Sequence, residues 1–171
     1  SGGLVRGYRT EDAETVVVAL GSVLGTIEDT IDAMRDDGVS IGALAIKSFR
    51  PFPLDEVREA LAGAKRVVVL EKALAVGIGG IVSANVRMAL SGIDLHGCTV
   101  VAGLGGRPIT KKSLRRLFAD AVADRLPPLS FLDMDWERVE AELKRMAAGG
   151  RSGPHAENML RDVGVVAARS H

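Results

Sequence analysis

The chain has few aromatic residues and a single cysteine. Aromatic residues make up 4% of its 171 residues, against 47% hydrophobic residues in total. This Ala-, Val-, Leu- and Ile-rich mixture suits parallel strands covered by helices on both faces, and it fits all-β and coiled-coil classes poorly. Cys98 opens an apolar, strand-like run, which favours a buried, unreactive thiol over a reactive one. One thiol allows no internal disulfide, cysteine-ligated zinc site or iron–sulfur cluster.

Net charge and long apolar runs are also missing. The 22 basic and 22 acidic residues cancel, so no net field attracts nucleic acid or an anionic membrane. No apolar run reaches the roughly 20 residues of a membrane-spanning helix, and none at the amino terminus has the length of a signal peptide. We therefore expect a cytoplasmic protein with neither a nucleic-acid partner nor a membrane partner.

The usual catalytic patterns are absent as well. His96 has no neighbour at metal-ligand spacing and stands in a polar segment before an apolar run. Ser22 would need glycine two residues later to form a hydrolase nucleophile elbow, but Leu24 is there. The dinucleotide fingerprint fails because Val82 and Pro108 occupy the positions where it needs glycine or alanine. The sequence also lacks the Gly-Lys-Ser/Thr pattern of a phosphate loop.

Apolar runs alternate with segments of helical periodicity, which predicts an α/β fold. We expect strands at residues 15–20, 41–49, 67–70, 98–102 and 131–134. We expect helices at 26–37, 54–61, 81–90 and 136–146, and another that Thr110 caps. The predicted domains are an N-terminal linker at 1–12, an α/β domain at 13–135, and a C-terminal helix with a tail at 136–171. That tail is either flexible or docks on a partner.

The turn after the strand at 98–102 carries candidate anion-binding residues. Gly105 and Gly106 precede Arg107, just before the helix that Thr110 caps. Backbone amides together with a guanidinium bind an anion in such a turn, or else Arg107 makes an internal salt bridge. Arg50 follows another strand. Because parallel strands end at the same edge of a sheet, we expect Arg50 and Arg107 to face that edge.

A second glycine cluster follows the strand at 67–70. Gly77, Gly79 and Gly80 precede the next helix, where glycine allows a tight turn and a close backbone approach. Close packing against another element or subunit is favoured here over phosphate binding.

Four segments together resemble a known family. They are residues 13–26, residues 48–53, Leu70-Glu71-Lys72 with the glycine cluster, and residues 103–107. Their order and spacing resemble the pyruvate and 2-oxoacid:ferredoxin (or flavodoxin) oxidoreductases. The resemblance is to the transketolase carboxy-terminal-like domain of the alpha subunit, called core domain II. Where that family usually has Asp-Arg, this chain has Glu71-Lys72.

The resemblance implies a three-layer α/β/α sandwich with a mostly parallel five-stranded sheet, one strand being antiparallel. It implies an enzyme that oxidatively decarboxylates pyruvate or another 2-oxoacid to acyl-CoA. That enzyme uses thiamine diphosphate, Mg, iron–sulfur clusters and coenzyme A, and it passes electrons to ferredoxin or flavodoxin. This domain would organise the assembly with the other domains or the beta, gamma and delta subunits. It would bind none of these cofactors alone and would be inactive in isolation.

Within that assembly, Arg50, Gly105, Gly106 and Arg107 would form a coenzyme A-facing surface, and Gly77, Gly79 and Gly80 would pack against a subunit. The sequence predicts no catalytic and no metal-ligating residue. Two alternatives stay open: the C-terminal domain of another transketolase-like thiamine enzyme of the E1 type, and an independent α/β module that binds a small ligand.

Overall fold

The computed structural model describes residues 3–75 and 79–149, and the chain divides into two units, Ser1–Asp133 and Met134–His171. The strands of the first unit are β1 (Val5–Tyr8), β2 (Thr15–Leu20), β3 (Ile41–Ile46), β4 (Arg66–Glu71), β5 (His96–Val101) and β6 (Leu129–Phe131). Its helices are α1 (Leu24–Asp36), α2 (Leu54–Leu61), α3 (Ile81–Ala89) and α4 (Lys111–Val122), with a short 3₁₀ turn, η1 (Leu104–Gly106). The described part of the second unit contains α5 (Trp136–Gly149). No helix among the described residues is long and apolar enough to cross a membrane.

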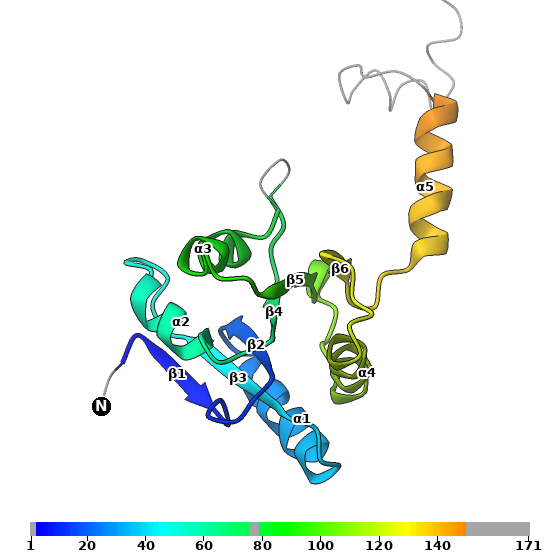
Figure 1. Ribbon diagram of the computed structural model, residues 1–171. Helices are drawn as coiled ribbons and strands as arrows, with labels where there is room; N and C mark the ends of the chain where they lie inside the picture. The colour runs from blue at the N-terminus through cyan, green and yellow to red at the C-terminus, as the bar shows by residue number, and fades with distance from the viewer. Residues whose placement is uncertain (1–2, 76–78, 150–171) are drawn as a thin grey trace, which may run out of the picture. The chain divides into compact units, whose positions relative to one another are not determined.

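The first unit is built on one sheet with the strand order β1-β3-β2-β4-β5-β6 (Figure 1). Strand β1 runs antiparallel to β3, and every other pair in the sheet is parallel. The predicted mostly parallel α/β sheet with one antiparallel strand is therefore confirmed. The predicted number of strands is wrong, because the sheet has six strands and not five.

The additional strand is β1, which lies within the stretch predicted to be a linker. Its residues pair with β3 from Val5 opposite Ile46 to Tyr8 opposite Ala43. An edge strand of this kind is held by main-chain hydrogen bonds, and its residues are half-buried or exposed. It therefore lacks the continuous apolar run that marks the buried strands.

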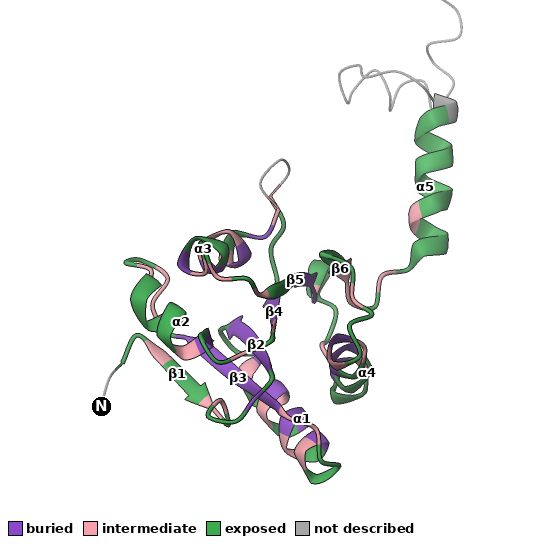
Figure 2. Cartoon of the chain, in the orientation of Figure 1, coloured by how far each residue is buried: buried purple, intermediate pink, exposed green. Residues whose placement is uncertain are grey.

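Helices cover both faces of the sheet, as the three-layer prediction requires. Successive side chains of a strand point to opposite faces. Val17 and Ala19 of β2 thus pack with α1 and α4, whereas Val16 and Val18 pack with α2 and α3. Phe118 of α4 is fully buried in the first of these cores. Figure 2 shows the buried residues concentrated in the strands and on the inner sides of the helices.

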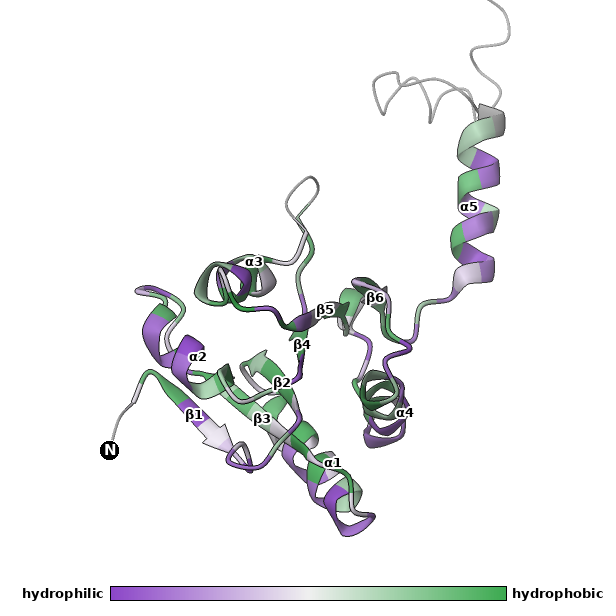
Figure 3. Ribbon diagram, in the orientation of Figure 1, coloured by the Kyte–Doolittle hydropathy of each residue, from purple (hydrophilic) through white to green (hydrophobic). Residues whose placement is uncertain are grey.

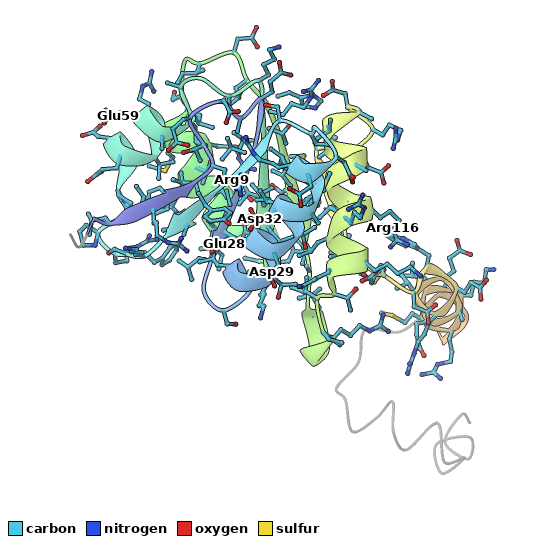
Figure 4. The ribbon with its side chains drawn as sticks, turned by 90° about the horizontal axis from the view of Figure 1, so that it is seen from below. Arg9, Glu28, Asp29, Asp32, Glu59 and Arg116 are labelled. Carbon is cyan, nitrogen blue, oxygen red and sulfur yellow. The ribbon has the colours of Figure 1, made fainter. Side chains whose placement is uncertain are left out.

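Ion pairs tie the outer surface of α1 to its neighbours. Asp32 pairs with Arg9 (Oδ1 to Nε, 2.8 Å), and Asp29 pairs with Lys111 of α4 (Oδ2 to Nζ, 2.8 Å). Arg9, Asp29 and Asp32 are labelled in Figure 4. The Tyr8 hydroxyl donates to Asp32 (2.8 Å), which raises the pKa of Tyr8. Exposed pairs of this kind contribute little individually, so the two buried cores carry most of the stability.

An exposed ion pair also links β4 to the loop after α4. The Asp124 carboxylate accepts from Nε and Nη2 of Arg66, both at 2.6 Å, and His96 Nδ1 lies 3.3 Å from Asp124 Oδ1. The bond from Arg66 lowers the pKa of Asp124 below its usual range. A carboxylate with a lowered folded-state pKa stabilises the fold above its unfolded-state pKa. That stabilisation is lost as pH falls through the folded-state pKa.

We therefore expect Asp124→Asn to weaken the acid dependence of stability. Asp124 has a positive φ of 53°, a conformation that asparagine tolerates, so the change removes the charge without straining the backbone. Urea denaturation from pH 7 downward should show a smaller loss of unfolding free energy below about pH 5 for the variant than for the wild type. The same pH dependence in both proteins would contradict the assignment.

Candidate functional site

The central strands create a crevice at the point where the chain changes direction across the sheet. Strand β2 is flanked by β3 on one side and β4 on the other. The chain passes from β2 through α1 to β3, then through α2 to β4, so α1 and α2 cover opposite faces. The segment that follows β2 consequently leads to one face of the sheet, and the segment that follows β4 leads to the other. In doubly wound α/β folds, ligands bind in the crevice at the carboxyl ends of such strands.

A pocket of about 470 Å³ lies at this crevice. Its lining comes from the ends of β2, β3 and β4 and from the start of α3: Leu20, Gly21, Ser22, Phe49, Leu70, Glu71, Lys72, Ala73, Ile81 and Val82. Half of these side chains are large and apolar, and Leu20 and Ile81 are each 39% exposed. The lining of the crevice is therefore largely apolar, and Ser22, Glu71 and Lys72 are its polar and charged members.

Glu71 is a buried carboxylate at the base of α3. Its side chain is among the buried charged groups, with the residue 3% exposed. One oxygen, Oε2, accepts from the backbone N–H of Val82 at 3.0 Å. The other, Oε1, accepts from the backbone N–H of Ser83 at 2.6 Å and from the Ser83 hydroxyl. The Ser83 oxygen accepts in turn from the Thr99 hydroxyl at 2.8 Å. Glu71 thus satisfies the unpaired amides at the amino end of α3.

Gly80 makes room for this carboxylate. It precedes α3 in an extended conformation, with φ −73° and ψ 134°. A Cβ atom on Gly80 would lie 2.0 Å from Oε1 of Glu71 and 2.9 Å from the Ser83 hydroxyl oxygen. Gly79 before it has a φ of +82°, a left-handed conformation that glycine adopts without steric cost. Gly80 therefore packs closely against Glu71 of its own chain, whereas Gly79 has open space around it and Gly77 lies outside the described residues.

The amino end of α3 is consequently unsuited to a phosphate group. The backbone N–H groups that bind pyrophosphate in related folds already donate to a carboxylate, which would repel another anion. Across residues 3–75 and 79–149 there is also no group of three His, Cys, Asp or Glu side chains placed to hold a metal ion. The residues present here do not fit the diphosphate and magnesium of thiamine diphosphate.

Cys98 likewise does not fit an iron–sulfur cluster. It is a buried, free cysteine in β5, and burial raises the pKa of its thiol to about 11. Clusters are held by several thiolates, and this thiol stays protonated at neutral pH. Its predicted burial is confirmed.

Arg50 lies beside the crevice. Its guanidinium stacks on the Phe49 ring, with Cζ 4.1 Å from the ring centroid, and Phe49 lines the pocket. Its Nη1 also donates to the Phe49 carbonyl oxygen at 2.7 Å. The stacking holds the charge over an aromatic face at the carboxyl end of β3.

Arg107 stands apart from the pocket lining. Gly105 and Gly106 have φ values of +66° and +77°, and they turn the chain from β5 toward α4. The Arg107 Nη1 group donates to the backbone carbonyl of Asp133 at 2.8 Å, whereas the Asp133 carboxylate pairs with Arg116. Arg107 therefore bonds to a carbonyl oxygen, and among the described residues no carboxylate forms an ion pair with it.

The two arginines share one end of the sheet without meeting. Arg50 follows β3 and Arg107 follows β5, so both stand at carboxyl ends of parallel strands, as predicted. Strands β2 and β4 lie between them, which separates the strand ends by roughly 14 Å at the usual strand spacing. The crevice between these strand ends was not predicted from the sequence. Nor was the hydrogen bond between Glu71 and Ser83.

Two solved structures share this architecture. The 2-oxoglutarate:ferredoxin oxidoreductase from Magnetococcus marinus, with 2-oxoglutarate, coenzyme A and succinyl-CoA bound, aligns with a TM-score of 0.54 and 18% identity. The match covers 69% of this chain and 19% of that one. An inactive β4 tetramer of a split gene transketolase aligns with a TM-score of 0.52 and 19% identity, covering 71% and 42%. The first unit is therefore a three-layer α/β/α domain of the transketolase-like class.

The chain belongs to the pyruvate:ferredoxin oxidoreductase core domain II family, whose model matches residues 13–114. Pyruvate synthase subunit PorA of Methanothermobacter thermautotrophicus is 38% identical over 115 residues, and PorA of Thermotoga maritima is 41% identical over 124 residues. The matches cover 67% and 71% of this chain but only 30% and 32% of those relatives. Ketoisovalerate oxidoreductase subunit VorA of Pyrococcus furiosus is 31% identical over 112 residues, covering 64% and 28%. The resemblance drawn from the sequence is confirmed.

Proposed function

We propose that this chain is the core domain II part of a 2-oxoacid:ferredoxin oxidoreductase and that it serves structure and assembly. The family match over residues 13–114 carries the proposal. Thiamine diphosphate, magnesium and the iron–sulfur clusters would reside on other parts of that enzyme, because Glu71 and the single Cys98 suit none of them. Ferredoxin or flavodoxin would accept the electrons, in the cytoplasm.

Pyruvate is the proposed 2-oxoacid. The PorA relatives, whose names describe pyruvate synthase subunits, are 38% and 41% identical to this chain, against 31% for the ketoisovalerate relative. An enzyme of the E1 or transketolase type is the alternative. It is favoured less, since the family model and the relatives at 38% and 41% identity are oxidoreductases, whereas the transketolase neighbour shares only the fold.

Arg50, Gly105, Gly106 and Arg107 are proposed to face coenzyme A in the assembled enzyme. Both arginines stand at the end of the sheet where this fold class binds ligands. The bond to the Asp133 carbonyl uses one of the five donors of the Arg107 guanidinium, so others can reach a phosphate. The left-handed turn at Gly105 and Gly106 is exposed and has open space around it, which lets a ligand approach the backbone.

The isolated chain is expected to catalyse nothing. Purified alone and supplied with thiamine diphosphate, magnesium, coenzyme A, pyruvate and a viologen acceptor, it should reduce no acceptor. The described residues do not fit the cofactors that carry the chemistry. Sustained, pyruvate-dependent reduction by the chain alone would contradict the proposed function.

Arg107→Ala should weaken the use of coenzyme A by the assembled enzyme. The loss of a charge-assisted hydrogen bond to a phosphate costs about 1.5 to 3 kcal/mol, which corresponds to about a 10- to 150-fold higher KM for coenzyme A. Decarboxylation of the oxoacid, followed as CO₂ release without coenzyme A, should be unchanged. Arg116→Ala is the matched control, because Arg116 pairs with the Asp133 carboxylate. Equal effects of the two variants would assign Arg107 a structural role only.

A further inference from the structure

Helix α5 carries a narrow apolar stripe on an otherwise charged surface. Trp136, Val139, Leu143 and Met146 follow one another at spacings of 3, 4 and 3 residues, which is the a/d pattern of a coiled coil. Trp136, Leu143 and Met146 are 56%, 58% and 71% exposed. Figure 3 shows apolar and polar bands alternating along α5, and Figure 2 shows its surface as largely exposed. We name these four residues the α5 seam.

Acidic residues border the α5 seam on both sides. At about 100° per residue, Glu140 and Glu142 each lie about 80° from the centre of the stripe, on opposite sides. They occupy the e and g positions, which set the choice of partner in coiled coils. Glu142 pairs with Arg145 at 3.1 Å, but side chains that are 51% and 80% exposed gain little from such a pair. The border therefore remains available to a cation of another molecule.

A side-chain cap stabilises the start of α5, but the helix is too short to be stable in water on its own. The Asp135 carboxylate accepts from the backbone N–H of Arg138 at 3.0 Å, which caps the first turn. Helices of about 12 to 15 residues are marginal in water unless an apolar face is buried, and α5 has 14 residues. A partner that covers the α5 seam would supply that burial.

A second copy of this chain is a poor partner for the α5 seam. In a parallel pair, position g of one helix faces position e of the other, which would place Asp135 against Glu140. In an antiparallel pair, like positions face each other, so Glu140 would meet Glu140 and Glu142 would meet Glu142. Like charges at these positions destabilise the pair in either orientation. Glu140 and Glu142 thus disfavour a homodimer through the α5 seam, and they favour a partner with basic residues at the facing positions.

We propose that the α5 seam docks against an apolar helix bordered by lysine or arginine on another polypeptide of the same oxidoreductase. This inference rests on the proposed function. The four seam residues provide the apolar contact, and Glu140 and Glu142 pair with the cations of the partner. Apolar area supplies the affinity, and the acidic border sets the orientation and the on-rate.

The test is affinity capture from cells that co-express the full chain with the other polypeptides of the oxidoreductase. Leu143→Glu should lower the amount of captured partner at least tenfold, because it puts a charge in the middle of the seam. Ala141→Glu, which introduces the same charge on the opposite face of α5, should leave capture unchanged. Glu140→Lys combined with Glu142→Lys should lower capture as well, because the border then repels a basic partner.

The possible failures are distinguishable. If the wild-type chain captures none of these polypeptides, the proposed function falls and the docking falls with it. If the wild type captures them and Leu143→Glu does so equally well, the proposed function stands and the docking is overturned. Light scattering of the purified chain is expected to give a monomer. A dimer that Leu143→Glu dissociates would make a second copy the occupant and would also overturn the inference.

Discussion

Gly80→Val is expected to prevent the first unit from folding stably. The added Cβ would lie 2.0 Å from a carboxylate oxygen of Glu71, which is itself held by α3. Either the carboxylate is displaced from the amides of α3, or α3 moves away from the sheet. Because both consequences disrupt buried polar contacts, we expect a loss of more than about 4 kcal/mol of unfolding free energy. Soluble yield and chemical denaturation measure it.

Gly25→Ala is the control for a side chain added where no neighbouring atom is in the way. Gly25 lies in α1 and is exposed, and a methyl group added there would meet no atom within 4 Å outside the backbone of its own helix. Because Gly25 is the second residue of α1, alanine there should leave the stability unchanged or raise it by up to about 1 kcal/mol. A Gly80→Val protein as stable as the wild type would mean that the Glu71 carboxylate lies elsewhere.

Glu71→Ala is expected to destabilise the first unit by about 3 to 5 kcal/mol. Two backbone N–H groups and the Ser83 hydroxyl lose their acceptor, and each buried unsatisfied group costs about 1 to 3 kcal/mol, part of which water recovers. Ser83→Ala removes one of the three donors and should cost less. Equilibrium denaturation of the three proteins gives the ranking.

In a protein that carries Glu71→Ala, a second substitution, Gly80→Ala, should destabilise the fold less than it does in the wild type. With the carboxylate gone, the alanine methyl group no longer meets it. The double variant should then be more stable than the sum of the single effects predicts, by about 0.5 to 3 kcal/mol. Additive free energies would show that Gly80 and Glu71 do not compete for the same space.

The buried part of the fold could be predicted from local pattern. Residues 15–20 form β2 as expected, because a continuous apolar run marks a strand that is covered on both faces. Residues 54–61 form α2 as expected, since Pro53 sets the helix entry and acidic residues occupy the first turn. The predicted Thr110 cap is confirmed, its hydroxyl accepting from the Ser113 N–H at 3.1 Å.

The edges of the sheet were predicted less well. Strand β1 pairs through its backbone on a half-exposed edge, so its hydropathy carries no periodic signal. Strand β6 was expected at 131–134 but lies at Leu129–Phe131. The carbonyl of Pro128 accepts from the Thr99 N–H at 2.9 Å, so pairing with β5 starts directly after the proline. The φ of +54° at Asp133 then turns the chain away.

The candidate site was predicted only in its outline. Successive strand-to-helix turns of a parallel sheet place Arg50 and Arg107 at one end, which the sequence indicates. Their separation depends on the strand order, which no local pattern encodes. A glutamate after an apolar strand looks solvent-exposed in the sequence. Only the packing of α3 against β4 shows that Glu71 is buried.

Glu71 gives this domain a different chemistry from a nucleotide-binding domain of similar topology. The helix end that would bind a phosphate at the crevice is occupied by a carboxylate of the chain itself. What remains at the carboxyl ends of β2 and β4 is a largely apolar crevice with Lys72 among its lining residues. Such a surface suits packing against the rest of an enzyme better than binding of a diphosphate, in agreement with the assembly role that we propose.

The most direct test of the proposed function is reconstitution of the enzyme with and without this chain. The other polypeptides of the oxidoreductase are co-expressed with or without it. Each preparation is purified and assayed for pyruvate- and coenzyme A-dependent viologen reduction. We predict that the chain co-purifies in fixed stoichiometry and that omitting it abolishes both assembly and activity. Full assembly and full activity without the chain would contradict the account.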